Sequence, residues 1–330
     1  MQRFKIFPSE AYKIIFAWER NKLLNSQRIL DIGGLDQTPS ECAAAFEFAF
    51  AKQIPARTPI KNVLVASAPR ICADNILNDV VIRQIKVPFV QLQNEKIPSF
   101  VSENTLSMVL DSPFWHDEAR DILEQCAQAE SNVVFITHED FSTAESAIAD
   151  NVFVLRLPKS LRRFINGEYY FIPALAILSQ ITELHIDRQN FDETQTAMKK
   201  VSADQAESIV KSIAGKAIFI YGMHDTTVGV ASQWREQIHQ TTQLATAYEF
   251  PEGISEPFLL SPELGIGKQI IFLRDCDENN KDREKLRGVA EQDAVPIIEI
   301  FGEGNSKFSR ICHLVYLGDV IKYYLEAKIQ

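Results

Sequence analysis

Glycine is scarce in the first half of this 330-residue chain, because only Gly33 and Gly34 of its 13 glycines precede Gly167. Loops that bind nucleotides or phosphate usually contain glycine, whose missing side chain lets backbone N–H groups approach the anion. The motifs GxSxG, GxGxxG and GxxxxGK[ST] are also missing. These absences argue against the common hydrolase, dinucleotide-binding and P-loop classes.

Cysteine pairs, metal-ligand clusters and long apolar runs are missing as well. The five cysteines lie at least 30 residues apart with no CxxC pair, which favours reduced, buried thiols over disulfides or a zinc site. None of the six histidines pairs with another at metal-ligand spacing, so we expect no metal and no cofactor. Apolar runs fall far short of the roughly 20 residues that span a bilayer, and the N-terminus lacks a signal-peptide pattern. We therefore expect a cytoplasmic protein without a membrane partner.

Positive charge is in deficit. Thirty-four basic residues stand against 44 acidic ones, which gives a net charge of −10. A polyanion would be repelled unless basic residues were strongly clustered. We therefore expect no nucleic-acid partner.

Short apolar or β-branched runs alternate with longer helical patterns, and this alternation favours parallel strands joined by crossover helices. The predicted fold class is α/β, with two doubly wound, flavodoxin-like parallel sheets. A polar stretch follows an apolar helix at 169–184 and places the domain boundary near residue 195, giving domains 1–195 and 196–330. The predicted strands are 62–68, 87–93, 106–112, 132–138 and 151–157 in the first half, and 217–222, 245–250, 269–274 and 296–301 in the second.

Helix signals complete this pattern. Thr38, Pro39 and Glu41 have the arrangement of a capping box and predict a helix from about residue 39 to 52. The polar stretch 187–200 is typical of a linker with a surface helix. The closing segment 306–328 spaces its apolar residues on one side of a long amphipathic helix.

Ligands of open parallel sheets bind beyond the carboxyl ends of the strands, so the loops after the strands hold the candidate site. The first loop contains Ser67 and Arg70; the arginine is either an anion contact or a surface residue in a turn. The third begins with Asp111, Ser112 and, four residues later, His116. This helix start either attracts an anion or is plain capping by Ser112.

Basic residues and histidines supply the remaining candidates. Arg156, Lys159, Arg162 and Arg163 lie within eight residues and form either an anion-attracting cluster or a solvated basic face. His224 and His239 are acid or base candidates, with a plain surface position as the alternative. His313, inside the closing helix, is expected to be a hydrogen-bonded packing residue.

Several segments resemble the bifunctional phosphoglucose/phosphomannose isomerases, which are built from paired sugar-isomerase (SIS) domains. The resemblance covers roughly residues 60–328. Its segments are IYGMHDTTVGVASQWREQ (220–237), YEFPE (248–252), IIFLRD (270–275) and FSRICHLVYLGDVIKYYLE (308–326), with KVPFVQLQNEKIPSFVSENTLSMVL (86–110), NVVFIT (132–137) and RRFINGEYYFIPALAIL (162–178) in the first half.

This resemblance implies a homodimer that opens the ring of a hexose 6-phosphate and moves a proton between C1 and C2 through an enediolate. By this resemblance, the family's arginine corresponds to Arg163 or Arg162, and its base glutamate corresponds to His239 or Gln240. Its ring-opening histidine corresponds to Ser255. His239 would then act as base and Arg163 as electrophile.

The family's loops are altered here. Its glycine loop falls on residues 65–74, where only Ile71 and Asp74 agree. Its phosphate loop falls on residues 111–119, where only the acidic Asp117 and Glu118 agree and Asp111 would repel a phosphate. Two functions follow. One is an aldose–ketose isomerase-like protein with catalytic Arg163, His239 and Ser255; the other is a noncatalytic SIS scaffold that binds a sugar derivative or a protein. The expected ligand-binding residues are Ser67, Arg70, Ser112, His116 and Arg162.

Overall fold

The structure is a computed structural model. It describes residues 32–52, 58–68, 72–92, 96–113, 115–139, 149–164, 168–182, 188–224, 226–241, 245–250, 267–275 and 295–329, together with several positions between these ranges. Residues 1–37 form a separate unit, which contains the 3-10 helix η1 (Ile32–Gln37). Residues 38–330 form the second unit, which holds every strand that the structure describes.

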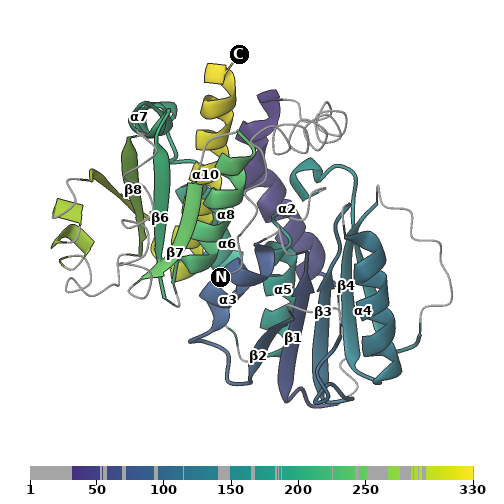
Figure 1. Ribbon diagram of the computed structural model, residues 1–330. Helices are drawn as coiled ribbons and strands as arrows, with labels where there is room; N and C mark the ends of the chain where they lie inside the picture. The colour runs from purple at the N-terminus through teal and green to yellow at the C-terminus, as the bar shows by residue number, and fades with distance from the viewer. Residues whose placement is uncertain are drawn as a thin grey trace, which may run out of the picture. The chain divides into compact units, whose positions relative to one another are not determined.

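The first half of this unit is built on a five-stranded parallel sheet, here called sheet A, with the order β2-β1-β3-β4-β5 (Figure 1). Every neighbouring pair runs parallel, and β1 lies between β2 and β3. The chain therefore reverses its direction of travel across the sheet at β1, which is the switch point where such folds bind ligands. The strands are β1 (Asn62–Ser67), β2 (Phe89–Leu92), β3 (Thr105–Leu110), β4 (Asn132–His138) and β5 (Val152–Leu157).

Helices cover both faces of sheet A. Leu64, Val109 and Phe135 pack with Ile122 and Cys126 of α4 in one apolar cluster. Figure 1 shows α2 and α5 on the opposite side of the strands from α4. Since both faces are covered, strands β1, β3 and β4 are buried almost throughout. The helices are α2 (Thr38–Phe50), α3 (Ala73–Val81), α4 (His116–Gln128) and α5 (Phe171–Ile181).

The second half carries a four-stranded parallel sheet, sheet B, with the order β7-β6-β8-β9. One face of it forms an apolar cluster around Phe219, Tyr221 and Phe272. The order matches the first four strands of sheet A, so the two halves repeat one topology. The elements are β6 (Ala217–Met223), β7 (Ala245–Phe250), β8 (Lys268–Arg274), β9 (Ile297–Phe301), α6 (Arg188–Met198), α7 (Ala203–Ile213) and α8 (Val228–His239).

The last helix, α10 (Lys307–Ile329), differs from its prediction. Every residue from 308 to 321 is buried, so α10 is not amphipathic over this length. It packs against α6, α7 and α8 at once, as Figure 1 shows for α6 and α8. A helix that is buried all round serves as a core helix. This stretch is consequently not available as a dimer face.

Helix α6 also differs from its prediction, because it is not a surface helix on a linker. The Phe191 ring stacks on Phe46 of α2 with ring centroids 3.9 Å apart and tilts against Phe308 of α10 at 5.1 Å. Polar residues dominate the sequence of α6, and one apolar stripe decides its packing. The predicted domain boundary at residue 195 falls within α6 and stays a prediction.

The two halves also touch where α3 crosses α8. A Cβ atom on Gly229 would lie 2.5 Å from backbone atoms of Asn75 and Ile76. The Gly229 N–H donates to Oδ2 of the buried Asp79 at 2.6 Å. Only glycine allows so close an approach of two helices.

The predicted capping box at α2 is wrong. The buried Thr38 hydroxyl has no hydrogen-bond partner, and the Glu41 carboxylate instead accepts the backbone N–H of Arg163 at 2.8 Å. Glu41 therefore fixes a distant turn rather than its own helix end.

Two predictions about thiols and apolar segments can be compared with the structure. Cys42, Cys72, Cys126 and Cys312 are free and buried, which confirms reduced thiols at these four positions; Cys276 lies outside the described residues. Within the described ranges, no helix has the length and apolar character needed to cross a membrane.

Candidate functional site

The carboxyl edge of sheet A is organised around Asp111, which follows β3. The Asp111 backbone N–H donates to the Ile136 carbonyl at 2.9 Å and so continues the pairing of β3 with β4. This brings the Thr137 hydroxyl to Asp111, where it donates to Oδ2 at 2.7 Å. The carboxyl group is fully buried. Burial raises the pKa of Asp111, while the hydrogen bonds from Thr137, His116 and the Ser112 N–H lower it.

His116, the first residue of α4, is held by the same carboxylate. Its Nδ1 atom lies 3.0 Å from both Asp111 oxygens. A carboxylate only accepts hydrogen bonds, so we assign the ring proton to Nδ1. The side chain is 25% exposed, and in the neutral ring the lone pair is on Nε2. This arrangement presents an oriented proton acceptor.

Two buried hydroxyl groups of this half have no hydrogen-bond partner. Ser112 Oγ and Tyr170 Oη make no hydrogen bond. Burial raises the pKa of Tyr170 well above its usual value, and the charge of Asp111 adds to this. The predicted capping of α4 by Ser112 is wrong, since α4 begins at His116 and has no side-chain cap. An unpaired buried hydroxyl costs about 1–3 kcal/mol.

Ser67, at the end of β1, is engaged within the protein. Its hydroxyl donates to the carboxyl of Asp74 in the first turn of α3. Burial raises the pKa of Asp74 despite this bond. Nearby Cys72 is buried, and burial raises the pKa of its thiol to about 12. Cys72 is therefore a protonated packing residue and not a thiolate nucleophile.

A second polar centre, around Asp319 of α10, lies between the two halves. Tyr169 Oη donates to Oδ2 of Asp319 at 2.5 Å from the first half, and Gln237 Nε2 donates to Oδ1 at 2.6 Å from α8. Burial raises the pKa of Asp319 to about 6, while the charges of Arg163 and Lys322 lower it. Asp319 thus joins both halves through one buried carboxyl group.

Arg163, in the 3-10 helix η2 (Arg162–Phe164), acts on this centre through its charge. Its backbone is tied to Glu41, and its positive charge lowers the pKa of Glu41, Tyr169 and Asp319. The neighbouring Arg162 is exposed and its charge also acts on Glu41. Arg163 of the predicted basic cluster is therefore a residue whose charge acts on groups of both halves.

His239 is the exposed last residue of α8. Its Nε2 atom faces the Ala245 carbonyl at the start of β7. A carbonyl only accepts, so Nε2 is protonated and Nδ1 is the ring atom left to act as a base. The next residue, Gln240, accepts a hydrogen bond from Lys322, one turn after Asp319 in α10. The end of α8 therefore lies at residues 319–322 of α10, and the charge of Arg163 acts on Asp319 in the same stretch.

The remaining predicted residues are less informative. His224 is exposed and pairs with Glu249 at the carboxyl edge of sheet B. Arg70 and Ser255 lie outside the described residues. His313 is buried, as predicted for a packing residue, but neither ring nitrogen has a hydrogen-bond partner, which corrects the expected hydrogen bond.

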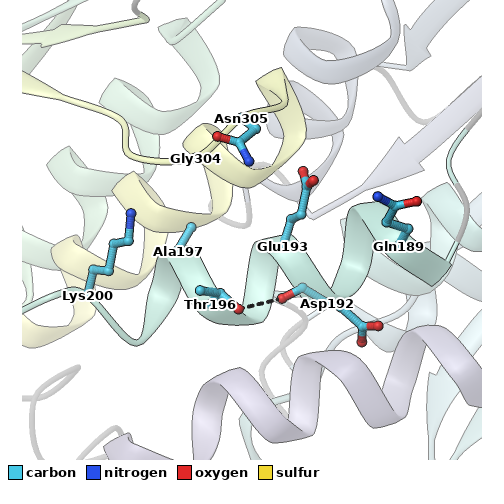
Figure 2. Close-up of a pocket in the computed structure, with 8 residues that line it drawn as sticks. All are labelled: Gln189, Asp192, Glu193, Thr196, Ala197, Lys200, Gly304 and Asn305. Carbon is cyan, nitrogen blue, oxygen red and sulfur yellow. Dashed lines mark hydrogen bonds between the residues drawn. The ribbon is translucent and has the colours of Figure 1, made fainter.

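A pocket of about 260 Å³ lies elsewhere, between α6 and the loop before α10 (Figure 2). Asp192 and Glu193 of α6 and Lys200, which follows the helix, line it together with Gly304 and Asn305. It contains none of the predicted site residues. Within the described residues no group of three or more His, Cys, Asp or Glu side chains is arranged to hold a metal ion.

The second half of the chain matches a known protein family. Residues 202–329 match the bacterial phospho-glucose isomerase C-terminal SIS domain family. The chain is also 21% identical, over 292 residues, to a bifunctional phosphoglucose/phosphomannose isomerase from Caldicellulosiruptor bescii, covering 82% of this chain and 84% of that protein. The predicted resemblance to this family is confirmed.

Solved structures show the same SIS fold. The tagatose-6-phosphate ketose/aldose isomerase from Escherichia coli is 12% identical with a TM-score of 0.63, covering 90% of this chain and 92% of that one. The C-terminal domain of the glucosamine-fructose-6-phosphate aminotransferase from Francisella tularensis is 12% identical with a TM-score of 0.64, covering 89% and 94%. The predicted α/β class with two parallel sheets is confirmed. Because the names of these neighbours differ in chemistry, the fold alone does not define a reaction.

Sequence reasoning missed several residues of these centres. Asp319, Tyr169 and Gln237 are far apart in the chain and meet only through α10. Thr137 lies near the carboxyl end of the buried strand β4. A hydroxyl group at such a position is the signal that could have predicted it.

Proposed function

We propose that this protein is a sugar-phosphate aldose–ketose isomerase-like protein of the phosphoglucose/phosphomannose isomerase type. The observation that carries the proposal is that the charge of Arg163 acts on Asp319, while Lys322, one turn later on α10, donates to Gln240 beside His239. In this proposal Arg163 stabilises the negative charge of an enediolate, and His239 acts as base through Nδ1. Arg162, Ser67, Ser112, His116, Arg70 and Ser255 remain proposed ligand or catalytic residues.

A coupled assay with fructose 6-phosphate, glucose 6-phosphate and mannose 6-phosphate tests this function. We expect His239→Ala to lower kcat by about 100-fold, the usual size of a general-base contribution, and Arg163→Gln to lower it by about 100-fold or more. Arg287→Gln is the matched control, because this arginine is half exposed and pairs with Glu299 of sheet B. Turnover that is unchanged in both test variants would contradict the assigned roles. If the unmodified protein shows no turnover at high concentration, the isomerase function is wrong.

A second function, a noncatalytic scaffold that binds a sugar derivative or a protein, is favoured by one observation. The loop where the family's phosphate site falls holds the buried Asp111 instead of a hydroxyl residue. A thermal-shift comparison of hexoses with their 6-phosphates tests this reading. Preferential stabilisation by the phosphorylated sugars would contradict it.

We also propose that the protein is a cytoplasmic homodimer whose SIS domains comprise residues 1–195 and 196–330. The family resemblance supports a dimer, although residues 308–321 of α10 are buried within one chain. Light scattering after size-exclusion chromatography should give twice the 37.4 kDa of the chain. A mass of one chain at micromolar concentration would contradict the dimer.

A further inference from the structure

The pocket of about 260 Å³ beside α6 lies at the carboxyl edge of sheet B, because one of its walls is the loop that joins β9 to α10. Ligands of open parallel sheets bind beyond the carboxyl ends of the strands. Its volume is just below the roughly 300–1,000 Å³ of pockets that hold drug-sized ligands. The pocket therefore suits a small molecule, and no residue of the proposed isomerase site lines it.

Two side chains of opposite charge enter the pocket from the same side. Figure 2 shows Glu193 and Lys200 pointing towards the loop that carries Asn305. The carboxylate of Asp192 points away from that loop in the same view. Glu193 and Lys200 are seven residues apart, which in helical geometry places them on one face, about 10 Å apart along the axis. The pocket thus has a negative end and a positive end.

Both charged groups are open to a ligand. In the described part of the chain, the Glu193 carboxylate makes no hydrogen bond or ion pair. The Lys200 Nζ atom lies 3.7 Å from Oε2 of Glu303, and the two side chains are 55% and 47% exposed. Ion pairs this exposed contribute little to stability, so Lys200 can exchange Glu303 for a ligand carboxylate at small cost.

The loop opposite α6 is held in place and presents a carboxamide. Arg310 donates to the Asn305 carbonyl at 3.3 Å through Nη1 and to the buried Asp275 through Nε. Gly304 has a φ of 134°, and a Cβ atom there would clash with the Ser309 hydroxyl, so the loop requires glycine. The Asn305 side chain itself has no hydrogen-bond partner among the described residues. Its amide can therefore donate to and accept from a ligand.

We propose that this pocket binds a small zwitterion, whose ammonium group pairs with Glu193 and whose carboxylate pairs with Lys200. A charge-assisted hydrogen bond of about 2.8 Å at each end leaves about 5 Å between the two charged groups of the ligand. An extended dipeptide has about this spacing, and its peptide group meets the carboxamide of Asn305. A dipeptide is therefore the ligand that uses all three side chains. This proposal does not depend on the isomerase function.

An NMR titration of the full chain with glycylglycine tests the proposal, with four comparison ligands that each lack one feature. We expect glycylglycine to bind, and 4-aminobutanoate, which has both charges without a peptide group, to bind more weakly. Butylammonium and butanoate carry one charge each and should bind at least tenfold more weakly than glycylglycine, the effect of one lost charged hydrogen bond. Glycine should also bind at least tenfold more weakly, because its charges are too close together to reach both side chains.

Substitutions identify the groups that bind. Glu193→Gln and Lys200→Gln should each weaken glycylglycine binding at least tenfold. Asn305→Ala should remove the advantage of glycylglycine over 4-aminobutanoate and leave the binding of 4-aminobutanoate unchanged, which a general loss of structure would not do. Glu207→Gln and Lys211→Gln are the matched controls, because they remove the same charges from an exposed pair on α7, and they should leave binding unchanged. Thermal unfolding without ligand checks that every variant is folded.

Three results would overturn the proposal. The first is no binding of glycylglycine at about 50 mM, roughly fiftyfold above a millimolar Kd. The second is binding that does not change in folded Glu193→Gln and Lys200→Gln. The third is butylammonium or butanoate binding as tightly as glycylglycine, because the pocket would then recognise a single charge. Binding is measured without turnover, so the outcome of the isomerase assay does not affect this test.

Discussion

Replacement of the buried Asp319 by asparagine should change how the stability of the protein depends on pH. The pKa of this carboxyl rises from its ordinary 3.8 to about 6 in the folded chain. The folded state therefore binds more protons than the unfolded state between these two values. The stability that protonated Asp319 contributes is fully present below pH 3.8 and is lost as the pH rises through 6. The loss amounts to about 3 kcal/mol.

An asparagine side chain at this position is neutral at every pH and can still accept from Gln237 and donate to Tyr169 through its amide. We therefore expect the unfolding free energy of Asp319→Asn, relative to the parent, to increase by about 2.4 kcal/mol between pH 4 and pH 7.5. Urea unfolding followed by tryptophan fluorescence measures this difference at each pH. Asp121→Asn, at an exposed site on α4, is the control and should show a much smaller change. A difference that stays flat, or falls with pH, would refute the reasoning.

Two further substitutions probe the packing of the halves. Gly229→Ala places a Cβ atom 2.5 Å from the backbone of α3 and should lower the free energy of unfolding, measured with urea, by more than about 3 kcal/mol. Gly288→Ala, with open space around its Cβ, is the control and should leave the stability unchanged. Equal stabilities of the two variants would contradict the close crossing of α3 and α8. Burial lowers the pKa of His313, so its contribution to stability is lost as the pH falls below about 6.5, opposite in sign to Asp319. His313→Leu should remove that part of the pH dependence in urea unfolding, and an unchanged profile would contradict it.

The framework of the sheets could be predicted because their strands are short apolar runs between helix patterns. The predicted strands 132–138 and 245–250 coincide with β4 and β7. The other strand predictions differ only at their ends, where strand termination depends on local hydrogen bonds. Complete burial of residues 308–321 was not predictable. The spacing of apolar residues predicts which face of a helix is buried, but not how many other elements surround the helix.

The site was predictable only as separate loops. Ser67, Ser112 and His116 were found because they follow strands of a parallel sheet. Their partners were not found, since Ser67 is bound to Asp74 and His116 to Asp111 through geometry that spacing does not encode. Glu41 shows the same limit: its local signal was a helix cap, and the tertiary contact with Arg163 replaced it.

The position of α10 has a consequence for the order in which the protein matures during translation. This helix follows, in the chain, each of α6, α7 and α8, against which it packs. Domains generally fold as they are synthesised, starting from the N-terminal side. Here the apolar surfaces of those three helices stay exposed until residues 307–329 have left the ribosome. A nascent chain that stalls before α10 should thus be a substrate for chaperones even with both sheets already made.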